Sequence, residues 1–455
     1  MCIGCGACAV RTGGAIPVTI GRFGVYQARP EGVAAEKLQQ GSRVCPFSDD
    51  SRSEDDLAAS RFGHLPNDKR IGRHSAIHAG RIADDSGIVD SSSGGLTSYA
   101  LEALLTRDLV DGIINVGRSE GSALFEYTVS SSIDDLRQSR KSAYYATSFT
   151  DVLSRIKGDG TRYAIVGVPC FIKAARSLAE EMPDLGAQIK YYIGIVCGHL
   201  KSTFFAESLA WQVGVAPDEI ASVDFRVKNR EKSSNQYDYE VTDVSDGVRT
   251  RNVLSTIDGN WGYGAFQPEA CNFCDDVFAE TADVVFGDAW LPRYEGDWRG
   301  TNIVVSRSAV IDEIMQSGQA SGALVLDELS IDDAAETQGG NFRHRRDGLR
   351  VRLMDDLSKG LSVPAKRVSP GYDDIRPKRI ALIRQRRAMS RLSLESFAAA
   401  RAARDYSLYS KPMSEAVAAY RRIDAASRGW KWRVRTQLGK LRQDVVRRFV
   451  ARKRG

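Results

Sequence analysis

The chain has 455 residues, of which 42% are hydrophobic and 27% are charged, and this is ordinary for a globular protein of two or three domains. Its 63 basic and 58 acidic side chains leave a net charge of only +5, which gives no reason to expect a nucleic-acid partner. No apolar run is long enough to span a membrane, and no basic stretch followed by an apolar core opens the chain, so a cytoplasmic protein is expected.

Three cysteines stand at the start of the chain, Cys2, Cys5 and Cys8, and a fourth, Cys45, precedes Pro46. A C-x2-C-x2-C run with a remote Cys-Pro is typical of the [4Fe–4S] loop of bacterial ferredoxins. Zinc is the alternative, although it usually takes two separate C-x2-C pairs, and a disulfide framework does not suit a reducing compartment. We therefore predict a ferredoxin-like 4Fe-4S module in residues 1–50.

The next two segments differ in amino-acid composition. Residues 51–85 are polar and are predicted to be a connecting segment with little core of its own. Ser93, Gly94 and Gly95 then precede an apolar stripe at helical spacing that starts at Leu96, so a helix with a serine cap is predicted there. The free amides of such a turn can bind an anion, and an ordinary helix cap is the alternative.

Two strand-like runs each lead into a cysteine. Residues 163–168 precede Cys170, and residues 192–196 precede Cys197. Ligands of open α/β sheets bind beyond the carboxyl ends of the strands, although a cysteine there can also be a small buried hydrophobe. A C-x2-C pair follows at Cys271 and Cys274. The eight cysteines thus divide into two sets of four, which predicts a second metal centre.

The rest of the middle of the chain mixes helices and strands, with antiparallel strands predicted near residues 223–228 and 237–241. The expected fold class is therefore α+β (mixed α/β), with a central mixed-sheet domain over residues 86–363. Residues 339–346 are interpreted as a basic loop that either holds an anionic cofactor tail or is simply solvated.

Residues 364–455 are predicted to be a helical basic tail. From Trp430 onward, basic residues alternate with aromatic and aliphatic ones. Such a stretch can lie on an anionic membrane surface, dock to an acidic partner or be a plain solvated helix. Removal of the tail after Val363 is expected to leave the cofactors in place.

Together, the motifs resemble the family of coenzyme F420 hydrogenase/dehydrogenase beta subunits, which includes the flavin subunit of the F420-reducing hydrogenase and the 7-hydroxymethyl chlorophyll a reductases. The resemblance covers about residues 1–305. The motifs that carry it are Cys2-x2-Cys5-Gly6-x-Cys8, Cys45-Pro46, Ser93-Gly94-Gly95-x-Thr97, Val166-Gly167-Val168-Pro169-Cys170, Cys197-Gly198-His199, and Cys271-x2-Cys274 with Gly287-Asp288-Ala289-Trp290.

The resemblance implies a flavoprotein, with FAD the usual flavin, and one or two [4Fe–4S] clusters. It places Ser93, Gly94, Gly95 and Thr97 in the flavin-binding loop. It assigns Cys170, Cys197, Cys271 and Cys274 to an inner cluster. Two departures bear on the substrate: Phe171 stands where the family often has Gln, and Gly198-His199 stands where it often has His-Gly.

The expected function is that of an oxidoreductase that moves electrons from ferredoxin or F420H2 through two clusters to a flavin and on to an organic substrate or a partner. His199 and Lys228 are candidates for proton delivery, with a structural role as the alternative for each. F420 is a candidate co-substrate, and the small-molecule substrate is not identified. Two other functions stay open: an electron-transfer subunit that works only within a complex, and a zinc-stabilised scaffold protein.

Overall fold

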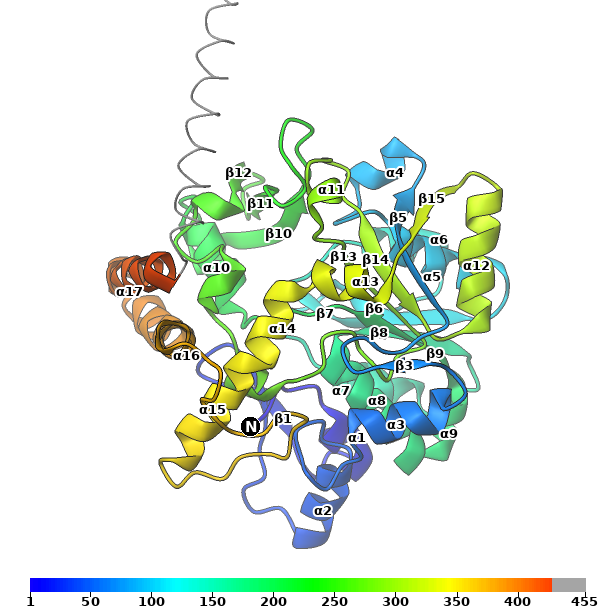
Figure 1. Cartoon of the computed structure of the whole chain (residues 1–455), viewed down its shortest axis with the longest axis horizontal. Coiled ribbons are helices and arrows are strands. Elements are labelled where there is room, and N and C mark those ends of the chain that lie inside the picture. The colour runs from blue at the N-terminus through cyan, green and yellow to red at the C-terminus, as the bar shows by residue number, and fades with distance from the viewer. Residues whose placement is uncertain (428–455) are drawn as a thin grey trace, which may run out of the picture.

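The structure, a computed structural model, describes residues 1–427. At its centre is a sheet of eight strands in the order β15–β5–β14–β13–β9–β8–β6–β7 (Figure 1). In chain order these strands are β5 (Ala76–Ile82), β6 (Gly112–Arg118), β7 (Phe125–Ser130), β8 (Tyr163–Gly167), β9 (Ile189–Ile195), β13 (Val284–Asp288), β14 (Asn302–Ser306) and β15 (Leu324–Glu328).

The four middle strands β13, β9, β8 and β6 run parallel, and antiparallel strands flank them on both sides. The prediction of a mixed α/β chain with a mixed sheet is therefore confirmed. Because the parallel strands share one direction, their carboxyl ends meet at a single edge. This edge is where residues from several distant segments come together.

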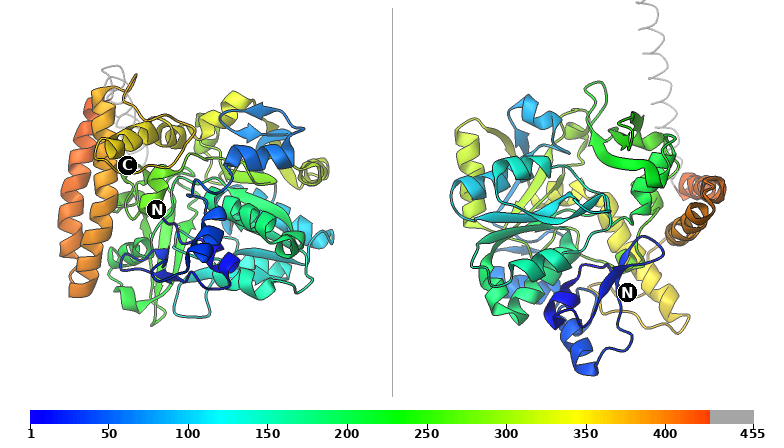
Figure 2. Two further views of the ribbon diagram at one scale, coloured as in Figure 1. Left: turned by 90° about the horizontal axis from the view of Figure 1, so that it is seen from below. Right: turned by 180° about the vertical axis from the view of Figure 1, so that it is seen from behind.

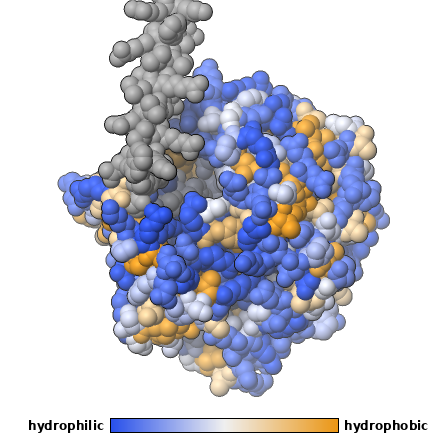
Figure 3. All heavy atoms as spheres, in the orientation of Figure 1, coloured by the Kyte–Doolittle hydropathy of each residue, from blue (hydrophilic) through white to orange (hydrophobic). Residues whose placement is uncertain are grey.

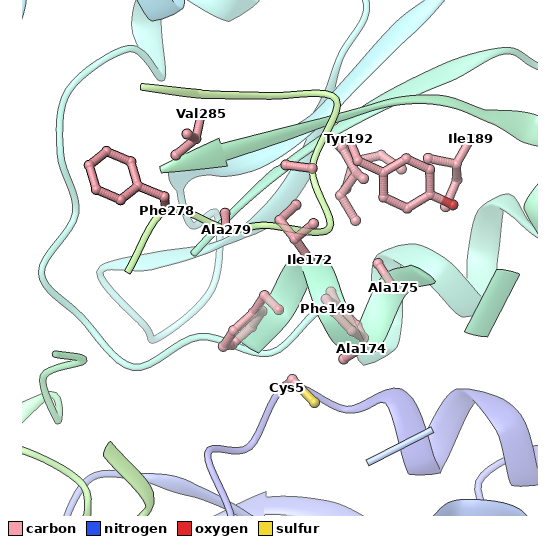
Figure 4. Packing of buried hydrophobic residues seen from close by; sticks show 14 of the residues in the cluster. Cys5, Phe149, Ile172, Ala174, Ala175, Ile189, Tyr192, Phe278, Ala279 and Val285 are labelled. Atoms are coloured by element: carbon pink, nitrogen blue, oxygen red, sulfur yellow. The ribbon is translucent and has the colours of Figure 1, made fainter. Parts of the chain in front are cut away.

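The two faces of the sheet pack against different helices. On β13, Val284 and Phe286 face a cluster formed with α5 (Leu96–Thr106) and α12 (Ala309–Ala320), whereas Val285 faces the opposite cluster. This alternation follows from the two-residue period of a strand. Figure 4 shows the second cluster, in which α8 (Pro169–Glu181) lies between the sheet and the segment that carries Cys5.

The N-terminal residues form α1 (Ala7–Thr12), β1 (Val18–Ile20), β2 (Tyr26–Ala28) and α2 (Ala35–Arg43). They lie beside α7 (Thr150–Ile156) and α8 at one end of the molecule (Figure 1). The amide of Phe149 donates to the carbonyl oxygen of Cys5 at 2.9 Å. The N-terminal segment is thus fastened to the main core and shares its hydrophobic cluster.

A second, antiparallel sheet contains β10 (Ile220–Val227), β11 (Asp238–Asp243) and β12 (Val248–Asn252), which confirms the antiparallel strands predicted for this region. It packs against α10 (Phe204–Trp211) and a pair of long helices, α16 (Pro377–Ala403) and α17 (Ser407–Ser427). The two helices lie side by side along one flank of the molecule (Figure 2). Their shared core is aromatic, with Phe266, Phe397 and Tyr409 in mutual ring contact.

Two segments differ from the sequence-based expectation. Residues 51–85, expected to be a connecting segment, contain α3 (Glu54–Phe62) and strand β5, which pairs with both β14 and β15 inside the large sheet. Residues 339–346, expected to be a basic loop, form helix α14 (Gly339–Arg345). In both cases the deciding contacts are with residues far along the chain, so local composition gave no signal.

The predicted basic tail also differs in its first half. Helices are present as expected, but Met389, Phe397 and Tyr409 are buried in the second core, so this half is part of the folded body and not a separate tail. The stretch from Trp430, for which membrane contact was considered, lies outside the described residues. Within residues 1–427, no helix is both long and apolar enough to cross a membrane.

The surface in the orientation of Figure 1 is mostly hydrophilic, with hydrophobic residues in separate patches (Figure 3). The remaining elements are β3 (Asn67–Asp68), β4 (Gly72–Arg73), α4 (Asp85–Val89), α6 (Ile133–Gln138), α9 (Pro183–Gln188), η1 (Pro217–Glu219), η2 (Val253–Ser255), η3 (Trp261–Tyr263), η4 (Glu269–Phe273), α11 (Pro292–Glu295), α13 (Ile331–Thr337) and α15 (Asp347–Leu357).

Candidate functional site

The four cysteines of the N-terminal segment come together, and we call Cys2, Cys5, Cys8 and Cys45 the outer cysteine group. Burial raises the pKa of Cys5 well above its ordinary value, and the charges of the other three thiols raise it further. The sulfur of Cys2 accepts hydrogen bonds from the backbone amides of Gly4 at 3.3 Å and Ala28 at 3.4 Å. The loop therefore surrounds its sulfurs with backbone N–H donors.

Gly4 explains why this loop needs glycine. It adopts φ of +69°, and a Cβ placed on it would lie 2.3 Å from Cβ of Tyr26 and 2.4 Å from the carbonyl oxygen of that residue. Both the positive φ and the close approach of β2 exclude a side chain. The spacing of the glycines in the sequence thus reflects a tight wrap.

A second group, the inner cysteine group, contains Cys170, Cys197, Cys271 and Cys274. Cys170 lies in the first turn of α8, Cys197 follows β9, and the last two lie at η4. Burial raises the pKa of Cys170 well above its ordinary value, and the charges of Cys274, Cys197 and Cys271 raise it further. The carboxyl edge of the parallel strands therefore gathers four cysteines that come from three separate segments of the chain, and their role as cluster ligands stays a prediction.

Arg345 of α14 is the main polar neighbour of the inner cysteine group. Its side chain is only 2% exposed, and its Nη1 donates to the sulfur of Cys274 at 2.9 Å. Its two guanidinium ends also donate to the carbonyl oxygens of Asp276, Cys197 and Gly198. The guanidinium thus holds both the loop of Cys274 and the end of the loop after β9.

The two cysteine groups are neighbours. The charge of Cys5 raises the pKa of Cys170. Burial raises the pKa of Tyr127, and the charges of Cys170 and Cys5 raise it further. The ring of Tyr127 stacks on Phe171 at 5.7 Å, and Phe149 meets both rings edge-on at 6.0 and 5.5 Å. Three buried aromatic rings therefore lie beside the region between the two cysteine groups.

Each donor set consists of four cysteines, which is the ligand set of a four-iron cluster. All eight cysteines are free thiols. Within residues 1–427, no three His, Cys, Asp or Glu side chains converge as one ion requires. Zinc at a Zn–S distance of about 2.3 Å would hold its sulfurs within about 4 Å of one another. A four-iron cluster spaces its ligands more widely, since each thiolate binds a different iron. Burial of mutually repelling thiolates is favourable only with cations between them.

A cavity of about 290 Å³ opens beside the inner cysteine group at the carboxyl edge of the sheet. The predicted flavin-loop residues Ser93, Gly95 and Thr97 line it, and so do Cys197 and His199. Gly94 does not line the cavity, but its missing side chain lets the loop approach the sheet, because a Cβ there would lie 2.6 Å from the carbonyl oxygen of Gly80. The structure therefore brings the Ser-Gly loop, residues 93–97, and the inner cysteine group to one cavity.

The cap of α5 differs from the predicted serine cap. The residue at the cap position is Gly95, with φ of +80° and no side-chain bond. The amide of Leu96 instead donates to the side-chain oxygen of Asn302 on β14, at 3.1 Å. A long-range side chain thus takes the place of the local serine.

Lys228 lies against the Ser-Gly loop but does not line the cavity. Its Nζ donates to the carbonyl oxygen of Ser93 at 3.0 Å and to that of Arg299. Burial, together with the charge of Arg226, lowers the pKa of Lys228 to about 7. These contacts fit a residue that fixes the loop, and its role in proton delivery stays a prediction.

His199 lies at the boundary between this cavity and a larger one of about 1100 Å³. Its side chain is 4% exposed, its ring centroid lies 4.6 Å from that of Trp261, and its Nδ1 lies 3.2 Å from Nη2 of Arg386. Its Nε2 has no hydrogen-bond partner among residues 1–427. Burial lowers the pKa of His199 well below its ordinary value, so the ring is neutral at pH 7.

Sequence reasoning did not identify Arg345, Trp261 or Arg386 as site residues. The basic run at residues 339–346 was a signal for Arg345, although the expected role was to hold a cofactor tail. Arg386 was only one of several basic residues in a helical segment. Nothing in the local sequence connects either arginine with a cysteine loop more than 70 residues away.

Comparison with known proteins identifies related chains. Residues 77–154 match the model of the N-terminal part of the beta subunit of coenzyme F420 hydrogenase/dehydrogenase, and residues 160–332 match the model of its C-terminal part. Together these matches cover more than half of the chain.

Two individual proteins are also similar. A subunit of the F420H2 dehydrogenase of Methanosarcina mazei is 27% identical over 205 residues, which are 43% of this chain and 53% of that protein. This chain therefore spans about half the length of the curated relative. A chain in a structure of the F420-reducing [NiFe] hydrogenase complex from Methanosarcina barkeri shares the fold, with a TM-score of 0.50 and 16% identity over 66% of this chain and 99% of that chain. The chain belongs to the family of coenzyme F420 hydrogenase/dehydrogenase beta subunits.

Proposed function

We propose that this chain is an iron–sulfur flavoprotein oxidoreductase. The outer and inner cysteine groups each hold a [4Fe–4S] cluster, and the 290 Å³ cavity takes the isoalloxazine ring of a flavin, with FAD the expected type. Electrons come from a low-potential donor such as ferredoxin or F420H2, and they leave to an organic substrate or a partner subunit.

One observation carries the proposal. Cys197 belongs to the inner cysteine group and also lines the cavity that contains the Ser-Gly loop. The inner group is in turn close enough to the outer group for the charge of Cys5 to raise the pKa of Cys170. The nearness of the two cysteine groups and the cavity supports a relay from the N-terminal segment to the cavity.

The chain's own residues hold this arrangement in place. The amide of Leu200 donates to the sulfur of Cys271 at 3.4 Å, and Arg345 donates to that of Cys274. Hydrogen bonds and positive charge at the sulfurs are the protein's means of setting a cluster potential. A bound flavin would supply the exchange between one-electron and two-electron chemistry.

The proposal about physiological partners is based on the two related proteins. One relative is named as a subunit of F420H2 dehydrogenase, and the other belongs to a hydrogenase complex that reduces F420. We therefore propose that this chain also works with a protein partner and that F420 is a candidate co-substrate. A cytoplasmic location is part of the same proposal.

Anaerobic purification with iron, sulfide and flavin measured on one preparation tests the function. We expect a brown protein with about eight iron atoms and one flavin per chain, as two four-iron clusters require. A colourless protein with stoichiometric zinc would instead support the scaffold function.

A second measurement separates an enzyme from an electron-transfer subunit. The isolated chain, reduced by dithionite, is mixed with F420 under anaerobic conditions, and F420 reduction is followed by its absorbance. Turnover by the isolated chain would exclude a subunit that acts only within a complex. Reduction of the bound flavin without turnover would support that second function.

A further inference from the structure

The larger cavity, of about 1100 Å³, is continuous with the proposed flavin cavity. Tyr144, Gly198, His199 and Trp261 line both cavities. A volume of this size accommodates a ligand as large as a dinucleotide cofactor or a sugar nucleotide. The boundary residues would place one end of such a ligand beside the proposed flavin ring.

The outer wall of this cavity comes from the end of the described chain. Residues of α14, α16 and α17 line it, including Arg343, Arg379, Arg386 and Tyr420. The family models end at residue 332. The wall is therefore an addition of this chain to the part that the family models describe.

Arg386 is a buried cation whose hydrogen-bond partners among residues 1–427 are neutral. Its Nη2 lies 3.2 Å from Nδ1 of His199, 3.3 Å from the carbonyl oxygen of Trp261 and 3.2 Å from Oε1 of Gln267. Its Nε is buried without a hydrogen-bond partner in the described chain. Burial of a guanidinium without a counter-ion is unfavourable, so the position favours an incoming negative charge.

Arg379, two turns earlier on α16, has a similar free donor. The side chain makes a long hydrogen bond, of 3.4 Å, to the carbonyl oxygen of Arg343, and its Nε is buried without a partner in residues 1–427. Other arginines of α16 are engaged by carboxylates, as Arg384 is by Asp355. Both arginines line the large cavity, and so does Arg226, whose Nε is likewise buried without a hydrogen-bond partner in the described chain.

The acidic residues that line the cavity form no ion pair with Arg386 in the described chain. Asp288 is held by Arg226 at 2.8 Å. Glu295 and Glu336 line the cavity without an ion pair to Arg386 in the described chain. Asp424 lines it as well, and its charge acts on Arg379.

We propose that the larger cavity binds an organic anion, with its phosphate or carboxylate groups on Arg379 and Arg386 and its uncharged part against Trp261. This inference rests on the proposed function because it assigns the smaller cavity to the flavin ring. The anionic groups can come from two ligands, either FAD itself through its diphosphate or a separate anionic substrate. The experiment below distinguishes them.

Calorimetric titration with inorganic pyrophosphate tests the site in three variants of the full chain. R379Q and R386Q remove the proposed contacts, and R384Q is the matched control on the same helix. We expect binding to the wild type and to R384Q, and about tenfold or greater weakening in R379Q and R386Q, since hydrogen bonds to a charged group are among the strong ones. R379Q keeps the test valid if R386Q does not fold, because the hydrogen bond that Arg379 makes is long and weak.

The flavin content of the same preparations identifies the source. If FAD supplies the anion, bound FAD blocks pyrophosphate binding and both variants lose FAD. If a separate substrate supplies it, the FAD-loaded chain still binds pyrophosphate and the variants retain FAD. A wild type that binds pyrophosphate neither with nor without FAD, or equal weakening in R384Q, would overturn the inference. If the chain contains iron and flavin, the proposed function stands with either result of the pyrophosphate titration. If the chain contains neither iron nor flavin, the proposed function is wrong, whether or not pyrophosphate binds.

Discussion

The outer and inner cysteine groups are assembled in opposite ways. Three of the four outer cysteines come from one short run at the start of the chain, and their donors are backbone amides of the same segment. The inner cysteines come from three separate places on the fold, and their strongest donor is the side chain of Arg345. The first group depends on local backbone geometry, whereas the second depends on the whole tertiary structure.

Truncation after Val363 is the strongest test of this difference. It removes Lys366, Arg367 and Arg387, which pair with acidic residues around the inner cysteine loop, and it also removes the aromatic core of α16 and α17. We expect loss of iron from the inner group and strong destabilisation, contrary to the expectation from sequence that the tail is dispensable. Iron analysis and thermal unfolding measure both effects, and unchanged iron content would contradict the contacts described.

The pair of variants C274S and C8S tests the two groups one at a time. Each should remove about half of the iron, because each belongs to one four-iron site. C274S acts on the group that borders the cavity, so it should impair reduction of the flavin by an external electron donor. Iron analysis and flavin absorbance check this. Unchanged iron in C274S would exclude that cysteine as a ligand.

A glycine substitution tests the local character of the outer group. G4A forces a Cβ to within 2.3 Å of Tyr26 and should cost roughly 3 kcal/mol of unfolding free energy or more, because overpacking adds to the cost of a positive φ. G13A is the matched control, since Gly13 has φ of +63° but open space around it, and should cost about 1 kcal/mol. Denaturant unfolding and iron analysis compare them. Equal losses would mean that the contact with Tyr26 is unimportant.

The substitution R345K should have the smallest effect. It keeps a positive charge but loses the forked contact with Cys274 and the neighbouring carbonyls. We expect unchanged iron content and a lower reduction potential for the inner cluster alone, because a hydrogen bond to sulfur stabilises the reduced state. Redox titration followed by electron paramagnetic resonance resolves the two clusters, and the outer cluster is the internal control. An equal shift in both would contradict a local role for Arg345.

The contrast also explains how much could be predicted from sequence. The cysteines, the strands before Cys170 and Cys197, and the mixed sheet carry local signals, namely spacing and short apolar runs. Strand β5 carries only a weak local signal, the alternation of Ile77 and Ala79 with other residues. It is a strand because it pairs with β14 and β15, which are distant in the sequence.

The same reasoning applies to the site. The roles of Arg345 and Arg386 depend on where α14 and α16 pack, and this is decided by distant hydrophobic contacts rather than by the residues around each arginine. The prediction of a serine cap was wrong for a related reason, because Asn302, more than 200 residues away, supplies the acceptor. The cysteines could be identified from the sequence as candidate ligands, but the side chains around them could not.

The aromatic rings beside the passage between the two cysteine groups have a consequence for charge transport. Tyr127, Phe149 and Phe171 are buried and in mutual ring contact, so they present apolar surface there. A dry passage conducts electrons by tunnelling but offers no route for hydrogen ions. Under the proposed function, hydrogen ions would therefore have to reach the flavin cavity by another path, and the larger cavity beside it would offer one.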